Sequence, residues 1–201
     1  MARDREAGAA AETRDGRVRR GEANRERILE ALYELVGQGT IQPTAEQVAK
    51  RAGVGERTVF RHFEDMETLY AEINARLQRE YRPILQEPIQ KGSLETRVAS
   101  LVERRVRVFD HALPYFRAAK THRPRSKFLS EEYSTTRRLL REELVRQLAP
   151  EIEAAGDLVE AIELLLTPDA YDRLRGEQRL GRDRVIQLLE QAVLALLRGA
   201  R

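Results

Sequence analysis

The chain has 201 residues, of which 41 % are hydrophobic and 34 % charged, so it can bury a core, and its net charge of +3 permits nucleic acid as a partner without requiring it. The absence of cysteine excludes disulfides, thiolate metal ligands and a cysteine nucleophile. No apolar run approaches the roughly 20 residues that span a bilayer, and the N-terminus has no apolar signal-peptide core, so we expect a cytoplasmic protein with no membrane partner.

The first segment, residues 1–20, is rich in small and charged side chains. Val18 is its only large aliphatic residue after Met1, so we expect a disordered arm that cannot bury enough apolar surface to order alone. The arm ends in the basic stretch RVRR. Two interpretations stay open for it: a solvated tail, or an arm that contacts DNA phosphates.

Three helices are predicted next. Apolar residues at three- and four-residue spacing indicate a helix over 22–37. Thr44 and Gln47 have the spacing of a capping box, which predicts a second, short helix, and Gly53 ends it because the position after a helix often needs positive φ. A third short helix is expected over about 55–61.

The rest of the chain is predicted to be helical almost throughout. A fourth helix starts near Phe63 and reaches about Arg82, and a helix capped by Ser93 opens a larger body in which another helix ends near Pro150. No alternation of useful length indicates a strand, so the expected fold class is all-α. The expected domains are a disordered basic arm over 1–20, a DNA-binding domain over 21–66 and a helical effector-binding and dimerisation domain over 67–201.

The second and third helices have the features of a helix-turn-helix. Ala49 is small where two helices must cross, Gly53 supplies the turn, and Val48, Val54 and Val59 face the interior. An α-helix fits the major groove, where residues of its first turns reach base edges. The outer surface of the third helix holds Glu56, Arg57, Thr58, Arg61 and His62, with Phe60 at its edge.

The stretch TAEQVAKRAGVGERTVFRHFEDMETLY resembles the DNA-binding segment of the TetR family of transcriptional regulators. The positions that match the family pattern are Thr44, Val48, Ala49, Ala52, Gly53, Val54, Thr58, Val59, His62, Phe63 and Leu69. Three positions depart from it: Gly55 stands for the usual serine, Phe60 for tyrosine and Met66 for lysine. The tight match covers about 24–70, and the remainder is similar only as a helical body of the right length.

Each polar residue of the motif has an expected role. Arg57 would contact a base or phosphate, Thr58 a thymine methyl group or a phosphate, and Arg61 a phosphate. His62 would contact a phosphate or, alternatively, pack beside the following phenylalanine, and Phe60 would lie on the sugar-phosphate backbone or close the small domain. The expected DNA-binding residues are Thr44, Gly55, Glu56, Arg57, Thr58, Phe60, Arg61 and His62.

Two C-terminal segments, 156–166 and 181–198, have apolar arcs wider than one stripe. A wide arc indicates either a central core helix or a second burial partner, and the resemblance implies a homodimer built on these two helices. The expected interface residues are Leu158, Ile162, Leu165, Leu166, Val185, Leu189, Val193 and Leu196.

The resemblance also implies a pocket for a small-molecule effector of unknown identity in the middle helices. For each candidate the alternative is an ordinary core position. The candidates are Phe109, His111, Tyr115, Phe116, His122, Phe128 and Tyr133.

Catalysis has little support. The three histidines lack metal-ligand spacing, and no phosphate-binding or nucleophile motif occurs, so we expect no enzyme, no metal and no cofactor. The expected function is a DNA-binding transcriptional regulator, a repressor by resemblance, that binds a palindromic operator as a homodimer and is released by its effector. The alternative is a helical interaction protein that retains the fold without sequence-specific DNA binding.

Overall fold

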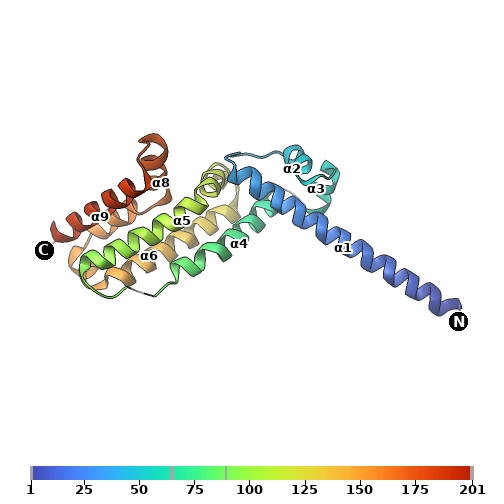
Figure 1. Cartoon of the computed structure of the whole chain (residues 1–201), viewed down its shortest axis with the longest axis horizontal. Helices are drawn as coiled ribbons and strands as arrows, with labels where there is room; N and C mark the ends of the chain where they lie inside the picture. Colours follow the sequence, from blue (N-terminus) through green and yellow to red (C-terminus); the bar gives the residue numbers. More distant parts are fainter. Residues whose placement is uncertain (1, 64–65, 89, 200–201) are drawn as a thin grey trace. The chain divides into compact units, whose positions relative to one another are not determined.

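The computed structural model describes residues 2–63, 66–88 and 90–199, and gives only the backbone of 2–18, 66, 150, 154 and 155. Every regular element in these residues is helical and none is a strand, which confirms the all-α prediction (Figure 1). The chain divides into two compact units, Met1–Ala75 and Arg76–Arg201, and the division falls inside helix α4.

The first unit contains α1 (Ala2–Gly37), α2 (Ala45–Ala52), α3 (Glu56–His62) and the first half of α4 (Met66–Leu85). α1 contacts both α2 and α3, and these two short helices contact each other. The shared core consists of the apolar stripe of α1 and one face of each other helix: Ile28, Leu32, Val36, Val48, Ala49, Ala52, Val59, Phe63, Leu69 and Ile73.

Helix α1 begins twenty residues earlier than the sequence predicts, at Ala2 rather than near 22. The backbone of the segment expected to be a disordered arm continues the helix, while Met1 and the side chains of 2–18 lie outside the described part. Local propensity accounts for this difference, because the segment is rich in Ala, Arg and Glu, which favour helix even where no apolar stripe exists.

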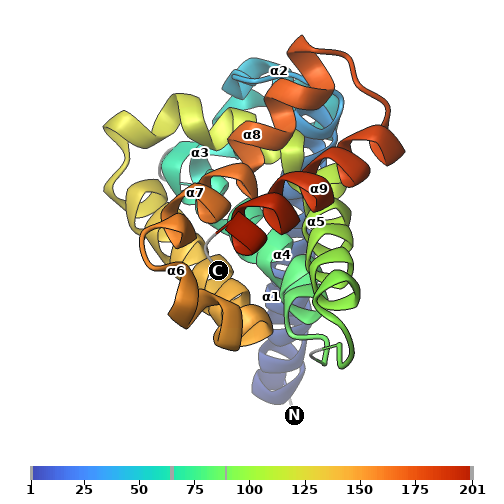
Figure 2. The same ribbon diagram turned by 90° about the vertical axis from the view of Figure 1, so that its left-hand side faces the viewer.

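The second unit is built around α5 (Leu94–His122), which contacts α6, α8 and α9 (Figure 2). After it come a 3₁₀ turn (Arg123–Arg125), α6 (Lys127–Ala155), α7 (Leu158–Leu165), α8 (Pro168–Asp172), a π-helix (Arg173–Glu177) and α9 (Arg182–Gly199). None of the helices in the described part of the chain combines the length and apolar character that a bilayer crossing needs.

The helix end expected near Pro150 falls close to a break: α6 runs to Ala155 as one element, but two helices meet inside it at Leu148, where the backbone is not helical. Proline removes one main-chain donor and crowds the preceding turn, and the helix accommodates this with a kink at Leu148, where φ is −123° and ψ is 25°. Leu144 and Leu148 are both fully buried, so core packing holds the two halves of α6 in place.

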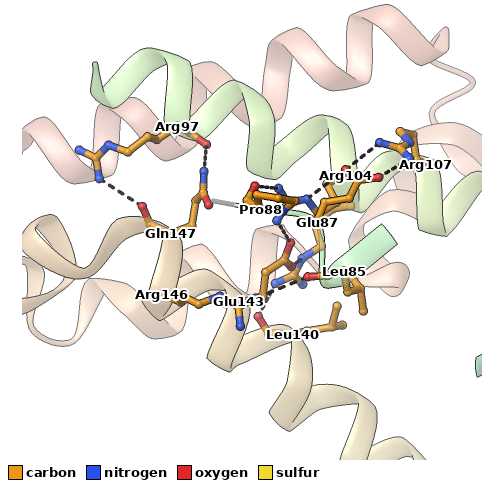
Figure 3. Close-up of polar contacts among 11 residues, drawn as sticks. Leu85, Glu87, Pro88, Arg97, Arg104, Arg107, Leu140, Glu143, Arg146 and Gln147 are labelled. Carbon is orange, nitrogen blue, oxygen red and sulfur yellow. Dashed lines mark hydrogen bonds and ion pairs between the residues drawn. The ribbon is translucent and has the colours of Figure 1, made fainter. Parts of the chain in front are cut away.

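A charged network lies inside the second unit (Figure 3). Glu143 of α6 accepts hydrogen bonds from Arg104 Nη1 at 3.0 Å and from Arg105 Nε at 2.7 Å, and all three side chains are buried. Arg104 Nη2 donates to the main-chain carbonyl of Pro88, and the two Nη atoms of Arg105 donate to those of Leu140 and Leu166. Arg104 Nε makes no hydrogen bond and lies 3.7 Å from a carboxylate oxygen of Glu87. Buried ionic groups are tolerated when they are paired and hydrogen-bonded in this way.

Candidate nucleic-acid interface

The turn between α2 and α3 is fixed by main-chain geometry. Thr44 Oγ1 accepts from the Gln47 N–H at 3.2 Å and Gln47 Oε1 accepts from the Thr44 N–H at 2.9 Å, which completes the predicted capping box. Gly53 has a φ of 65°, a conformation that residues with a Cβ rarely adopt. The Val54 N–H donates to Ala49 O at 3.0 Å. These contacts set the direction in which α3 leaves the turn.

Helix α3 is held from inside by two apolar residues. Val59 and the C-capping Phe63 are each 1 % exposed and belong to the core of the first unit. Gly55 is the N-cap, and its φ of −75° and ψ of 147° are ordinary extended values, so this glycine is not required by backbone conformation. It provides no side-chain acceptor, which leaves the N-terminus of α3 without a side-chain cap.

The opposite face of α3 is exposed. Arg57, Phe60 and Arg61 are three and four residues apart, so they share one face, and Glu56 is exposed beside them. Neither arginine forms an ion pair with a carboxylate among the described residues. The Phe60 ring is 49 % exposed, so it does not close the domain's core.

His62 and Thr58 lie at the sides of this face and are half-buried. The His62 ring is turned toward α1, where a Cβ at Gly21 would lie 3.8 Å from its Cε1. Burial lowers the pKa of His62, and the charges of Arg61 and Arg25 lower it further. This geometry favours the packing interpretation of His62 over a phosphate contact.

One supporting residue was not identified from the sequence. The Arg25 guanidinium lies 5.3 Å from the centre of the Phe63 ring and forms an ion pair with Glu72 of α4. Arg25 therefore ties α1 to the end of α3 and to α4. No local pattern could have indicated this, because its partners lie 38 and 47 positions further along the chain.

The structure places the seven pocket candidates in different surroundings. Phe109 and Tyr115 are buried core residues, and the Phe109 ring packs at a tilt against Tyr171 with 5.7 Å between ring centres. His111 is exposed on α5, with its Nε2 2.5 Å from Glu80 of α4. His122 is half-buried, and burial lowers its pKa.

Two candidates, Phe116 and Tyr133, do share a cavity, together with the buried Arg105. Its volume of about 20 Å³ leaves room for one water molecule. The Tyr133 ring also lies 3.9 Å from the Arg123 guanidinium carbon. Phe128 is half-buried on α6 and does not line this cavity.

The eight interface candidates separate into two groups. Five have their side chains in the core of the second unit: Ile162, Leu166, Val185, Leu189 and Val193. Leu158, Leu165 and Leu196 are half-buried on the flanks of α7 and α9, which contact each other. Leu164, which belongs to the apolar arc of 156–166 but not to the eight candidates, is 69 % exposed and is the most exposed large apolar side chain in the described part of the chain.

Comparison with known proteins agrees with this geometry. Residues 28–73 match the family model described as bacterial regulatory proteins of the tetR family. A comparison with curated proteins gave no significant match.

Several solved structures share the fold of nearly the whole chain. A transcriptional regulator from Rhodococcus sp. Rha1 is 21 % identical, with a TM-score of 0.68 over 87 % of this chain and 96 % of its own. A tetR-family regulator from Streptomyces coelicolor is 18 % identical, with a TM-score of 0.69 over 89 % of this chain and 82 % of its own. Salmonella enterica GusR is 18 % identical, with a TM-score of 0.60 over 87 % of this chain and 95 % of its own.

The helix-turn-helix geometry and the family match identify residues 28–73 as a DNA-binding domain of the type found in bacterial regulatory proteins of the tetR family. The solved structures extend the shared fold, and the fold alone, over nearly the whole chain.

Proposed function

We propose that the protein represses transcription in the cytoplasm by binding a palindromic operator as a homodimer, with α3 in the major groove. The observation that carries this proposal is the exposed face of α3, where Arg57, Phe60 and Arg61 stand opposite the buried anchors Val59 and Phe63. Arg57 is in the first turn of the helix, the part that reaches base edges in this motif.

Each exposed side chain has a role in this proposal. Arg57 donates to a guanine edge or a phosphate, and Arg61, one turn further on, neutralises a phosphate. The Phe60 ring lies on the sugar-phosphate backbone, which would remove its exposed apolar surface from water.

The N-terminus of α2 offers a second phosphate contact. Thr44 is exposed, and the capping box uses the N–H groups of Thr44 and Gln47. The N–H groups of Ala45 and Glu46, in the first turn, have no carbonyl of their own helix to bond. They lie at the positive end of the helix dipole, where a phosphate oxygen is favourable.

A DNA titration tests the first part of the proposal. Arg57→Ala should weaken binding to a selected operator by about 5- to 150-fold, since one arginine base contact contributes roughly 1–3 kcal/mol. Arg138→Ala, which removes an equally exposed charge from α6, should change affinity by less than about twofold. Equal effects of the two variants, or no salt-dependent operator binding, would favour the alternative of a helical interaction protein without DNA recognition.

We propose the homodimer interface on the exposed flanks of α7 and α9, namely Leu158, Leu164, Leu165 and Leu196. Four exposed or half-buried apolar residues on two contacting helices form a surface that one subunit alone does not cover. A two-fold axis through such a surface pairs the same helices of both subunits. The five buried candidates then support the interface from within each subunit.

A single charged substitution in the proposed interface tests the dimer. Leu164→Glu should convert the dimer to a monomer in light scattering after size exclusion, with an unchanged circular dichroism spectrum because the side chain is already exposed in one subunit. The matched control is Val145→Glu, which puts the same charge at an exposed apolar position of α6. A dimer that survives Leu164→Glu would place the interface elsewhere.

We propose that an effector in the second unit releases the operator through α4. The second half of this helix is held by the body: Tyr81 Oη lies 3.4 Å from Thr136 Oγ1, and Gln78 donates to Glu132. The first half belongs to the DNA-binding unit. A ligand that favours another position of α4 would change the separation of the two recognition helices and lower operator affinity.

A further inference from the structure

A hollow of about 420 Å³ lies between α5 and the chain that joins α8 to α9. We call it the α8–α9 hollow and define it by Asp110 and Arg117 of α5 and by Tyr171, Arg175 and Arg179. Its volume falls within the roughly 300–1,000 Å³ typical of small-molecule sites. None of the residues predicted from the sequence to line an effector pocket lines it.

The charges around the hollow favour an anion. Three arginines line it against one acid, Asp110, which already accepts from Tyr171 Oη and, at 2.8 Å, from Arg182 Nε. Burial and the bond to Asp110 raise the pKa of Tyr171 to about 12, so its hydroxyl keeps its proton. Arg117 is itself paired with Asp172, so the positive charge of the hollow that is left without a carboxylate among the described residues is that of Arg175 and Arg179.

Two of the arginines keep donors for a ligand. Arg117 binds Asp172 through Nε and Nη2, with Nε–O distances of 3.0 and 3.1 Å, which leaves Nη1 without a partner among the described residues. Arg179 makes no ion pair in the described part of the chain. Arg175 Nη1 instead donates to Leu180 O at 2.7 Å, a contact within the segment that joins α8 to α9.

The backbone of this loop is strained at Arg179. Its φ of 55° is the only positive φ of a residue other than glycine among those described, and a π-helix precedes it. A Cβ at Gly176 would lie 3.1 Å from both Arg117 Nη2 and Asp172 Oδ1, so a side chain there would press on this ion pair. Strained backbone and π-helical turns concentrate at functional sites.

We propose that the α8–α9 hollow is a binding site for a small organic carboxylate with a short apolar body. The carboxylate lies between Arg117 and Arg179, and the apolar body lies on the wall formed by Leu113, Pro114 and Leu180. Charge-assisted bonds to two guanidiniums suit this group. The proposal goes beyond operator binding and does not depend on it, because the ligand is bound by the second unit alone.

Calorimetric titration of the full chain without DNA tests the proposal, with benzoate as the probe and benzamide as its uncharged counterpart. Benzoate should bind saturably and at least ten times more tightly than benzamide. Arg179→Gly should weaken benzoate binding at least tenfold while leaving the melting temperature unchanged or higher, because glycine adopts the positive φ without strain. Arg173→Ala, in the same segment but exposed and paired with Glu177, should bind as the parent does.

Three results would overturn the proposal. The first is no saturable benzoate binding, and the second is equal binding by the parent and Arg179→Gly. The third is inorganic phosphate binding as tightly as benzoate, which would show that the apolar wall contributes nothing. Loss of operator binding in a separate assay would refute the proposed repressor function and would leave these results unaffected.

Discussion

Replacing Glu143 by glutamine should destabilise the second unit far more than the same change at an exposed glutamate. The carboxylate is 2 % exposed and is shared by Arg104 and Arg105, which are 3 % and 2 % exposed. Glutamine keeps the shape and one acceptor oxygen but presents an amide N–H₂ group to the second arginine. Two buried cations would then face a neutral side chain that repels one of them.

The magnitude follows from the contacts. Glu143 accepts two charge-assisted hydrogen bonds, at 3.0 and 2.7 Å, and hydrogen bonds to charged groups are worth about 1.5–3 kcal/mol each. The carbonyls of Pro88 and Leu140 continue to hold the arginines, so not all of this is lost. We expect a loss of about 3–5 kcal/mol, the range for removing one partner of a buried ion pair.

Urea unfolding followed by circular dichroism measures this loss as a change in the free energy of unfolding. The control is Glu142→Gln, at the neighbouring position, where the side chain is 61 % exposed and lies 4.0 Å from Arg138. This exposed pair should contribute less than about 0.5 kcal/mol. A loss below about 1 kcal/mol for Glu143→Gln, similar to that of the control, would refute the view that the buried network stabilises the second unit.

Three further predictions concern the DNA-binding unit. Thr44→Ala should lower the free energy of unfolding by about 1 kcal/mol, because it removes the capping hydroxyl of α2. Gly55→Ser should raise the free energy of unfolding by a few tenths of a kcal/mol, since the extended backbone at Gly55 accepts serine and nothing lies within 4 Å of an added Cβ. Chemical denaturation of both variants measures the direction of each change. Phe60→Ala should change stability by less than about 0.5 kcal/mol yet weaken operator binding, and a stability loss above about 2 kcal/mol would show that the ring serves the core. The folded-state pKa of His62 lies below the usual 6.5, so the unfolded chain binds the proton first as the pH falls. The free energy of unfolding should therefore decrease below about pH 6.5. Unfolding curves for His62→Gln should show a smaller decrease over the same pH range.

Local signals predicted the DNA-binding unit well. The capping box of Thr44, the positive φ of Gly53 and the inward Val59 each follow from residues within a few positions, and short-range geometry decides them. The same local rules placed a helix end near Pro150, and two helices of α6 meet across a kink at the buried Leu148, two residues earlier.

Long-range contacts limited how much of the second unit could be predicted from the sequence. The wide apolar arc on α9 left two alternatives, a central core helix or a second burial partner, because periodicity alone does not say which side faces its own subunit. Val185, Leu189 and Val193 proved to be core. The α8–α9 hollow joins α5 to residues some 60 positions later in the chain, so no sequence spacing predicted it. In a chain with 36 basic residues, the sequence likewise does not distinguish Arg104 and Arg105 as a buried pair.

Selection of genomic DNA fragments on the purified protein near physiological salt tests the central claim most directly. The parent chain should enrich one palindromic sequence, and the double variant Arg57→Ala, Thr58→Ala should lose that enrichment, because both changes fall on α3 and leave its anchors Val59 and Phe63 in place. Equal enrichment by the two proteins, or none by either, would contradict the claim that the exposed face of α3 recognises an operator.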